Sequence, residues 1–288
     1  MKLTNPTELK ALLGRHGFSF SKSLGQNFLI DENVLNKITA AAGVSAGDCV
    51  LEIGPGAGTL TQRLAELGAR CTAVEIDKAL LPILSETMAE YESFHLLNND
   101  VLKVDIGALA EADFGGAPFH VIANLPYYIT TPIVMRLLEE KLPVRSMTLM
   151  VQKEVADRMC APCGGKEYGA LSVAVQYYSE PSVICRAEPH CFIPQPKVAS
   201  SVVHLKVADK PRVAVGDERR FFAVVKSAFG QRRKTLVNAL SKSPYINVEK
   251  DAVIAALKSL GLDESIRGER LSIEQFAALT DCLTTEKA

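Results

Sequence analysis

The 288 residues, of which 48% are hydrophobic and 23% charged, suit one large globular domain joined to a smaller one. Residues 1–20 lack the apolar core of a signal peptide and no apolar run approaches the ~18 residues of a membrane helix, so we expect a cytoplasmic protein. The net charge of −1 combines two basic segments, residues 1–24 and 206–234, with an acidic remainder; this pattern suits localised contacts to phosphate, although solvated surfaces explain it equally well.

Short apolar runs alternate with helical stretches between Asp48 and Gln152. This alternation is typical of a mainly parallel sheet with helices on both faces. Such a sheet binds ligands outside the carboxyl ends of its strands. Strands are predicted at residues 50–53, 71–75, 120–123 and 147–151, and helices at residues 59–67, 78–88 and 131–140.

After Val207 the strand pattern fades and helical periodicity takes over, with residues 208–211 as a linker. The chain is therefore divided into a basic N-terminal arm (1–24), a main α/β domain (25–207) and a small helical domain (208–288). Helices in the last domain are predicted at residues 218–229, 235–241, 248–260 and 273–283.

A glycine-rich turn, Glu52-Ile53-Gly54-Pro55-Gly56-Ala57-Gly58, follows the first predicted strand and opens a helix. Gly54 and Gly56 let the backbone approach a ligand closely, and Glu75, at the end of the next strand, can bind both hydroxyls of a ribose. Alone, the loop suits a nicotinamide cofactor, S-adenosylmethionine or a structural turn. Glu52 favours the sulfonium cofactor, since a carboxylate before the loop repels a pyrophosphate.

The tetrapeptide Asn124-Leu125-Pro126-Tyr127 directly follows the strand at 120–123, at the ligand-binding edge of the sheet. The amine of an aminopurine is a poor nucleophile because its lone pair is delocalised into the ring. Acceptors that hold its N–H bonds, the Asn124 side-chain oxygen and the Leu125 or Pro126 carbonyl, direct that lone pair towards a methyl group. Tyr127 offers a face on which the base stacks. As an isolated tetrapeptide, the same residues also suit a structural turn.

Together these motifs resemble the ribosomal RNA adenine N6-dimethyltransferase family over almost the whole chain. Further motifs that carry the resemblance are Gly25-Gln26-Asn27-Phe28-Leu29, Glu75-Ile76-Asp77, Asn99-Asp100 and Phe192-Ile193-Pro194-Gln195-Pro196-Lys197-Val198. The resemblance implies a Rossmann-like class I methyltransferase sheet with a small C-terminal helical domain, and S-adenosylmethionine as cofactor. The cofactor contacts it implies are Asn27, Leu29, Gly54, Gly56, Glu75, Asp100 and Asn124.

The resemblance also suggests how the substrate is held. Phe192 is expected to sandwich the target adenine with Tyr127, since the base must leave its stack to reach the site; ordinary core packing is the alternative. The segments 229–236 and 267–271 resemble the small-subunit branch of the family, which dimethylates two adjacent adenosines near the 3′ end of small-subunit RNA. Arg232, Arg233 and Lys234 are then expected to bind phosphates, or else form a solvated helix start.

The seven cysteines are expected to stay reduced. Cys160 and Cys163 form a C-x-x-C pair without a second pair, so no metal site is expected there. His190 and Cys191 match no family motif and are assigned structural roles.

The leading hypothesis is a monomeric enzyme that acts on small-subunit ribosomal RNA within an assembling subunit. Three alternatives stay open. A large-subunit RNA methyltransferase would confer antibiotic resistance, and a nicotinamide-dependent oxidoreductase would leave residues 124–127 unexplained. A ribosome-assembly factor with a vestigial site would bind RNA without catalysis.

Overall fold

The computed structural model describes residues 1–21 and 23–285 and divides the chain into two compact units. One unit comprises Met1–Ala156 and Pro181–Val207, and the other comprises Asp157–Glu180 and Ala208–Ala288. The larger part of the second unit begins at Ala208, the start of the predicted linker. The unit also includes residues 157–180, which the sequence pattern assigned to the main domain. These residues belong to the second unit because α8 (Ala170–Tyr178) packs on α9 (Glu218–Gly230). The rings of Tyr177 and Phe221 are stacked, with their centroids 5.0 Å apart.

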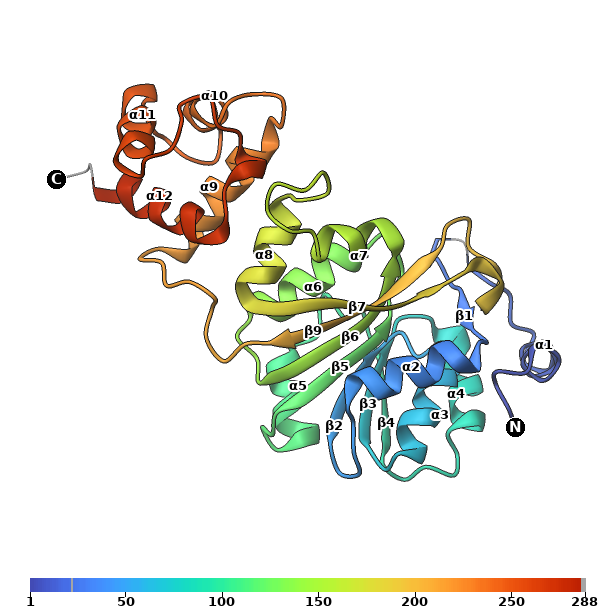
Figure 1. The fold of residues 1–288 in the computed structure, drawn as a ribbon. Coiled ribbons are helices and arrows are strands. Elements are labelled where there is room, and N and C mark those ends of the chain that lie inside the picture. The colour runs from blue at the N-terminus through green and yellow to red at the C-terminus, as the bar shows by residue number, and fades with distance from the viewer. Residues whose placement is uncertain (22, 286–288) are drawn as a thin grey trace. The chain divides into compact units, whose positions relative to one another are not determined.

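A seven-stranded sheet forms the centre of the first unit (Figure 1), in the order β4-β3-β2-β5-β6-β9-β7. The five strands from β4 to β6 pair in parallel, and β9 pairs with β6 antiparallel. The predicted α/β class and the four predicted strands are confirmed. The bounds are β2 Cys49–Ile53, β3 Arg70–Glu75, β4 Phe94–Asn98, β5 Phe119–Asn124, β6 Val144–Gln152, β7 Ser179–Ala187 and β9 Ser200–Val207.

Helices connect the parallel strands, as the alternating pattern predicted. Asp31 and Asp105 begin α2 and α5 by accepting backbone N–H bonds with their side chains, which satisfies donors that a helix start leaves free. The elements between strands are α2 Glu32–Ala42, α3 Thr59–Glu66, η1 Lys78–Leu80, α4 Leu81–Thr87, α5 Ile106–Phe114, α6 Thr130–Glu139 and α7 Lys153–Met159.

The basic N-terminal segment contains a helix, α1 (Pro6–Arg15), which the sequence pattern did not predict. Leu9 and Leu12 are fully buried in a cluster with Leu80 and Ile83, so the segment packs against the main unit. A two-stranded sheet of β1 (Phe28–Leu29) and β8 (Phe192–Ile193) then joins this end of the chain to the late proline-rich motif, preceded by the short helix η2 (Pro189–Cys191).

The second unit is helical, as predicted for the C-terminal region. Tyr168 and Phe276 lie in its core, and the Tyr168 hydroxyl donates to the Leu271 carbonyl at 3.1 Å. None of the helices in residues 1–21 and 23–285 is long and apolar enough to cross a membrane. The remaining bounds are α10 Leu236–Ser241, α11 Lys250–Ser259, η3 Gly268–Arg270 and α12 Ile273–Thr285.

Candidate active site

A cavity of about 180 Å³ opens at the carboxyl ends of β2, β3 and β5, the edge at which a parallel sheet places its ligand. The segment just before β1 and the turn after β4 complete its wall. The cavity brings together nine residues that the sequence singled out from five separate segments: Asn27, Gly54, Gly56, Glu75, Asp100, Asn124, Leu125, Pro126 and Tyr127.

The glycine turn has backbone angles that would be strained for a residue with a side chain. Gly54 and Gly56 have φ of +71° and +61°, in the left-handed region. A Cβ on Gly56 would lie 3.0 Å from ring carbons of Phe28. Glycine at 56 therefore lets Phe28 cross the loop, which brings the preceding residues 24–27 to the cavity wall.

Glu75 holds the end of β3 and offers a carboxyl group to the cavity. Its Oε1 accepts the Asp77 backbone N–H at 2.8 Å, and Oε2 lies 3.4 Å from the Gly56 N–H. Only 4% of the residue is exposed, and this burial raises the pKa of Glu75 to about 7. The carboxyl group is thus fixed in place and titrates near neutral pH.

Asp100, after β4, also lines the cavity. Its Oδ1 accepts the Leu102 N–H at 3.0 Å, so its side chain also closes a turn. Asn98 donates from its side chain to the Glu75 carbonyl at 2.7 Å, and the Asn99 N–H reaches the same carbonyl at 3.1 Å. These bonds fix the position of Asp100 relative to Glu75.

The Asn124 amide has a defined orientation. Its Nδ2 donates to the Asn27 carbonyl at 2.8 Å, and Asn27 in turn donates from Nδ2 to the Gly25 carbonyl at 2.9 Å. Because Nδ2 is engaged, Oδ1 of Asn124 is the atom free to accept a hydrogen bond from a ligand in the cavity. The N-terminal motif thus orients the side chain that ends β5.

A second acceptor lies beside Asn124. The Pro126 carbonyl already accepts the Ile129 N–H at 3.2 Å and the Thr130 hydroxyl at 3.1 Å. Among the described residues, no donor bonds the Leu125 carbonyl, while the Leu125 N–H donates to Met150 at 3.1 Å. Of the two backbone acceptors considered from the sequence, the Leu125 carbonyl is therefore the one available to a ligand.

Two tyrosines follow these acceptors, and the sequence interpretation considered only the first. The Tyr127 hydroxyl is 2.8 Å from the Ser200 hydroxyl, and burial raises the pKa of Tyr127. Tyr128 also lines the cavity and is 58% exposed, which makes it the more accessible ring. The position of Tyr128, an aromatic residue directly after the tetrapeptide, is the sequence feature that indicates a place at the cavity.

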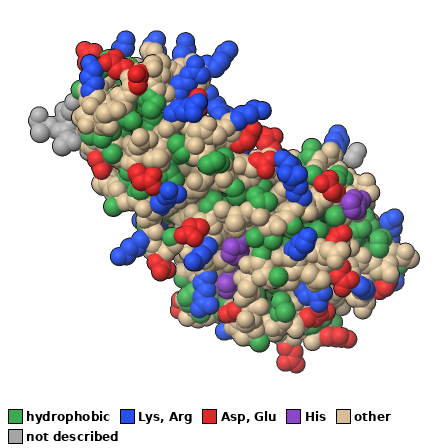
Figure 2. Space-filling model, viewed as in Figure 1, with side chains coloured by type: hydrophobic (Ala, Val, Ile, Leu, Met, Phe, Trp, Pro, Cys, Tyr) green, Lys and Arg blue, Asp and Glu red, His purple; other side chains and the backbone are tan. Residues whose placement is uncertain are grey.

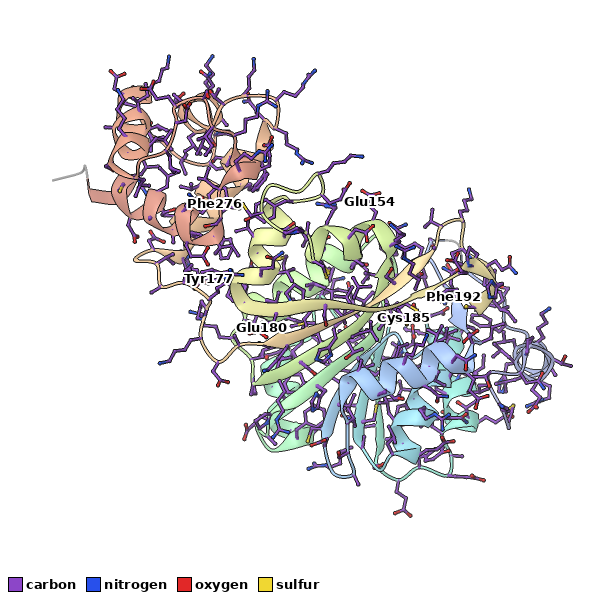
Figure 3. The ribbon with its side chains drawn as sticks, viewed as in Figure 1. Glu154, Tyr177, Glu180, Cys185, Phe192 and Phe276 are labelled. Carbon is purple, nitrogen blue, oxygen red and sulfur yellow. The ribbon has the colours of Figure 1, made fainter. Side chains whose placement is uncertain are left out.

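Leu29 and Phe192 are not on the wall of this cavity, unlike the other residues predicted for the site. Leu29 lines a smaller cavity together with Gly54, Gly56 and Asn124. Leu29 and Phe192 pair across β1 and β8 and belong to one hydrophobic cluster, with 5% and 1% of their surface exposed. Figure 3 shows Phe192 within the first unit, near Cys185 of β7. In this structure the Phe192 ring packs in the core, as its alternative role expected, and it would have to move in order to stack on a base.

Comparison with known proteins identifies the family of this chain. A profile described as "Ribosomal RNA adenine dimethylase" matches residues 17–285. The chain belongs to this family. It is 52% identical over 282 residues to ribosomal RNA small subunit methyltransferase A of Alkaliphilus oremlandii, with 98% of both chains covered. It is 48% identical over 285 residues to the protein of that name from Clostridioides difficile, covering 99% of this chain and 98% of the relative.

Solved structures agree with the class I methyltransferase fold. A dimethyladenosine transferase from Plasmodium falciparum superposes with a TM-score of 0.73 at 25% identity, covering 88% of this chain and 95% of its own. The 23S rRNA methyltransferase ErmE superposes with a TM-score of 0.69 at 27% identity, covering 90% and 100% respectively. The protein is therefore a methyltransferase whose cofactor is S-adenosylmethionine, and an oxidoreductase is excluded.

The cavity residues fit this cofactor. It supplies an electrophilic methyl group on a sulfonium sulfur, next to an adenosine. The missing side chain of Gly54 leaves room at the cavity, since only the Asn124 carbonyl oxygen lies within 4 Å of where a Cβ would stand, and most of the exposed cavity wall is apolar. Glu75 and Asp100 place carboxyl groups on the cavity wall, of the kind that can accept hydrogen bonds from the ribose hydroxyls and the adenine amine.

Glu52 does not contribute in the way that the sequence suggested. It is 1% exposed and does not line the cavity, and burial raises the pKa of Glu52 to about 8. Buried away from the cavity and with a raised pKa, Glu52 exerts little repulsion on a pyrophosphate and does not by itself distinguish the two cofactors. The cofactor predicted from it is nonetheless the one that the family uses.

The basic residues predicted to bind RNA lie in the second unit, in the turn between α9 and α10. Arg233 and Lys234 are exposed. Arg232 is exposed too, yet its guanidinium donates to the carbonyls of Lys166 at 2.7 Å and Tyr168 at 3.4 Å. Figure 2 shows many Lys and Arg side chains on the visible face of this unit.

Proposed function

We propose that this enzyme dimethylates the N6 amines of two adjacent adenosines near the 3′ end of small-subunit ribosomal RNA, within an assembling subunit. The observation that carries the proposal is the orientation of the Asn124 amide. With Nδ2 bonded to the Asn27 carbonyl, Oδ1 is left to accept an N–H from the target amine.

The chemistry follows from two acceptors at the carboxyl end of β5. Asn124 Oδ1 and the Leu125 carbonyl hold the two N–H bonds of the adenine amine. This contact withdraws the nitrogen lone pair from the ring and directs it towards the methyl group of the cofactor. The nitrogen becomes cationic on transfer and then loses a proton to water, so the residues at the site need not supply a strong base.

Aromatic and basic residues then hold the RNA. The target base stacks on Tyr127, and the exposed ring of Tyr128 contacts the RNA at the mouth of the cavity. Arg233 and Lys234 bind phosphates, and Arg232 fixes the turn that presents them. The proposal also includes two expectations from the sequence, that the enzyme is a monomer and that it acts in the cytoplasm.

The large-subunit alternative is less well supported. The small-subunit methyltransferases of Alkaliphilus oremlandii and Clostridioides difficile are 52% and 48% identical to this chain over nearly its full length, whereas ErmE, a 23S rRNA methyltransferase, is 27% identical. A binding factor without catalysis would have no need for the engaged Asn124 amide.

The decisive experiment supplies labelled S-adenosylmethionine and small ribosomal subunits from cells that lack dimethyladenosine. The RNA is then digested and its modified nucleosides are identified. We expect dimethyladenosine in small-subunit RNA alone. Label confined to large-subunit RNA would support the alternative branch, and absence of label in both would support a binding factor.

A further inference from the structure

A group of three potential metal ligands lies outside the active site, where the two-stranded sheet ends. Asp31, His190 and Cys191 each have one ligand atom within 4.8 Å of the other two, the one such group found across residues 1–21 and 23–285. Asp31 is 159 positions from His190 in sequence, so the sequence pattern gave no indication of the group. It belongs entirely to the first unit.

The backbone brings the three residues together and holds them. Phe28 pairs with Ile193 and Leu29 with Phe192, so the chain leaves β1 opposite the point where it enters β8. There the Ile30 N–H donates to the Cys191 carbonyl at 2.8 Å. The Cys191 N–H donates to Glu188 at 2.9 Å, which closes the η2 turn that carries His190 and Cys191.

Asp31 is oriented by its helix. Its Oδ1 accepts the Val34 N–H at 2.9 Å at the start of α2, which leaves Oδ2 3.7 Å from the Cys191 sulfur. In a tetrahedral zinc site with bonds of 2.0–2.3 Å, neighbouring ligand atoms lie about 3.5 Å apart. The sulfur and the carboxylate are thus already near the required spacing, and the histidine needs only a small adjustment.

The donor set selects the metal. A thiolate, an imidazole and a carboxylate are all zinc ligands, whereas calcium and magnesium favour sets of oxygen atoms. Cys191 is buried, with 5% of its surface exposed, and packs in the core cluster that contains Phe192. His190 is exposed. A metal therefore has an entry path from the His190 side, where water can take the fourth position.

We propose that Asp31, His190 and Cys191 form a zinc-binding site that cross-links the start of α2 to the η2 turn. The bound ion fixes the end of β1, directly after residues 24–28 of the cavity wall. This site is independent of the proposed function, because its ligands do not line the cavity.

The test titrates the full-length, metal-free protein with Co²⁺ alone, as a spectroscopic substitute for zinc. We expect one equivalent to bind with the visible bands of tetrahedral cobalt and a thiolate charge-transfer band, and Zn²⁺ to displace it. Cys191→Ser should abolish the charge-transfer band. His190→Ala and Asp31→Asn should each weaken binding at least about tenfold. Asparagine keeps an acceptor for the Val34 N–H, so Asp31→Asn preserves the helix start.

Matched controls separate this site from other thiols. Cys185→Ser, which alters a nearby cysteine that is not in the group, should bind cobalt like the wild type. So should a double variant with Cys160→Ser and Cys163→Ser. Loss of the cobalt bands in that double variant, or their absence from the wild type, overturns the proposal. Full affinity in His190→Ala also overturns it, because an exposed side chain can be truncated without unfolding the protein.

Discussion

Asn124 illustrates how a single hydrogen bond determines the chemistry of a site. An asparagine amide presents either an acceptor or a donor, and the sequence could not say which one faces the substrate. The Asn27 carbonyl, 97 positions away, accepts from Nδ2 at 2.8 Å, which leaves the oxygen as the acceptor that the proposed mechanism assigns to the adenine amine. The N-terminal motif therefore orients the side chain that we propose to be catalytic.

Replacing Asn124 with alanine tests this role. Asn124→Ala removes one of the two acceptors, and we expect kcat for methyl transfer to fall by roughly 10²–10³, by analogy with loss of one donor from an oxyanion hole. RNA binding, measured separately, should stay within about twofold. Asn36→Ala, which alters an exposed asparagine on α2, should leave both quantities unchanged. Full turnover by Asn124→Ala would contradict the amine-holding mechanism.

We expect Glu75 to make cofactor binding sensitive to pH. If it binds the ribose, the ionised carboxylate is the form that accepts bonds from two hydroxyls, and burial raises the pKa of Glu75 to about 7. As pH falls below this value the side chain is protonated and loses acceptor capacity. The Kd for S-adenosylmethionine should therefore rise roughly tenfold between pH 8 and pH 6.

Calorimetric titration at several pH values measures this dependence. Glu75→Gln, which cannot ionise, should bind more weakly at pH 8 and lose most of the variation between pH 6 and pH 8. If the variant kept the wild-type pH profile, another group would be responsible for it.

At the scale of elements, the basic residues in the turn between α9 and α10 fall into two kinds. Arg232 donates to the carbonyls of Lys166 and Tyr168, so it shapes the turn, whereas Arg233 and Lys234 remain exposed. The three residues were treated alike from sequence, because a run of basic residues does not reveal which of them will find a backbone carbonyl.

Variants of this turn should separate the two kinds of residue. Arg233→Ala with Lys234→Ala should weaken RNA binding and reduce the slope of log Kd against log salt by roughly 0.7–0.9 for each lost phosphate contact. The Tm should not change. Arg232→Ala should instead lower the Tm. An unchanged salt slope in the double variant would mean that Arg233 and Lys234 are merely solvated.

At the scale of the whole molecule, the buried carboxyl group of Glu52 links the stability of the fold to pH. Its pKa is about 8 when folded, mainly because of burial, against an ordinary value of 4.5. Between these values the unfolded chain has released the proton and the folded chain retains it. The free energy of unfolding therefore falls as pH rises from about 4.5 to 8, and Glu52 adds no further change above that range.

Glu52→Gln should remove this penalty. We expect the variant to gain free energy of unfolding relative to wild type as pH rises from 5 to 8.5, on the order of a few kcal/mol. Urea denaturation of both proteins at each pH isolates the contribution of Glu52 from that of other titrating groups. A constant difference between the two proteins would show that Glu52 has an ordinary pKa when folded.

Local patterns in the sequence were sufficient for the strands β2, β3, β5 and β6, for the helices α3, α4 and α6, and for the glycine turn and the residues after β5, whereas β4 and α5 were not predicted. The predicted features depend on apolar periodicity and turn geometry, which neighbouring residues determine. Strand order, in particular the antiparallel β9 and the edge strand β7, depends on pairing between distant segments and was not predicted.

Only the tertiary structure decided several properties of individual side chains. It buried Phe192 against Leu29, engaged Asn124 Nδ2 with the Asn27 carbonyl, raised the pKa of Glu52 and placed Asp31 beside Cys191. The physical reason is common to all four. Residues far away in the chain determine the burial of a side chain, its hydrogen-bond partner and its local dielectric. The type of a residue and its near neighbours in the sequence therefore limit the roles that it can have, and tertiary packing decides which of these roles it has.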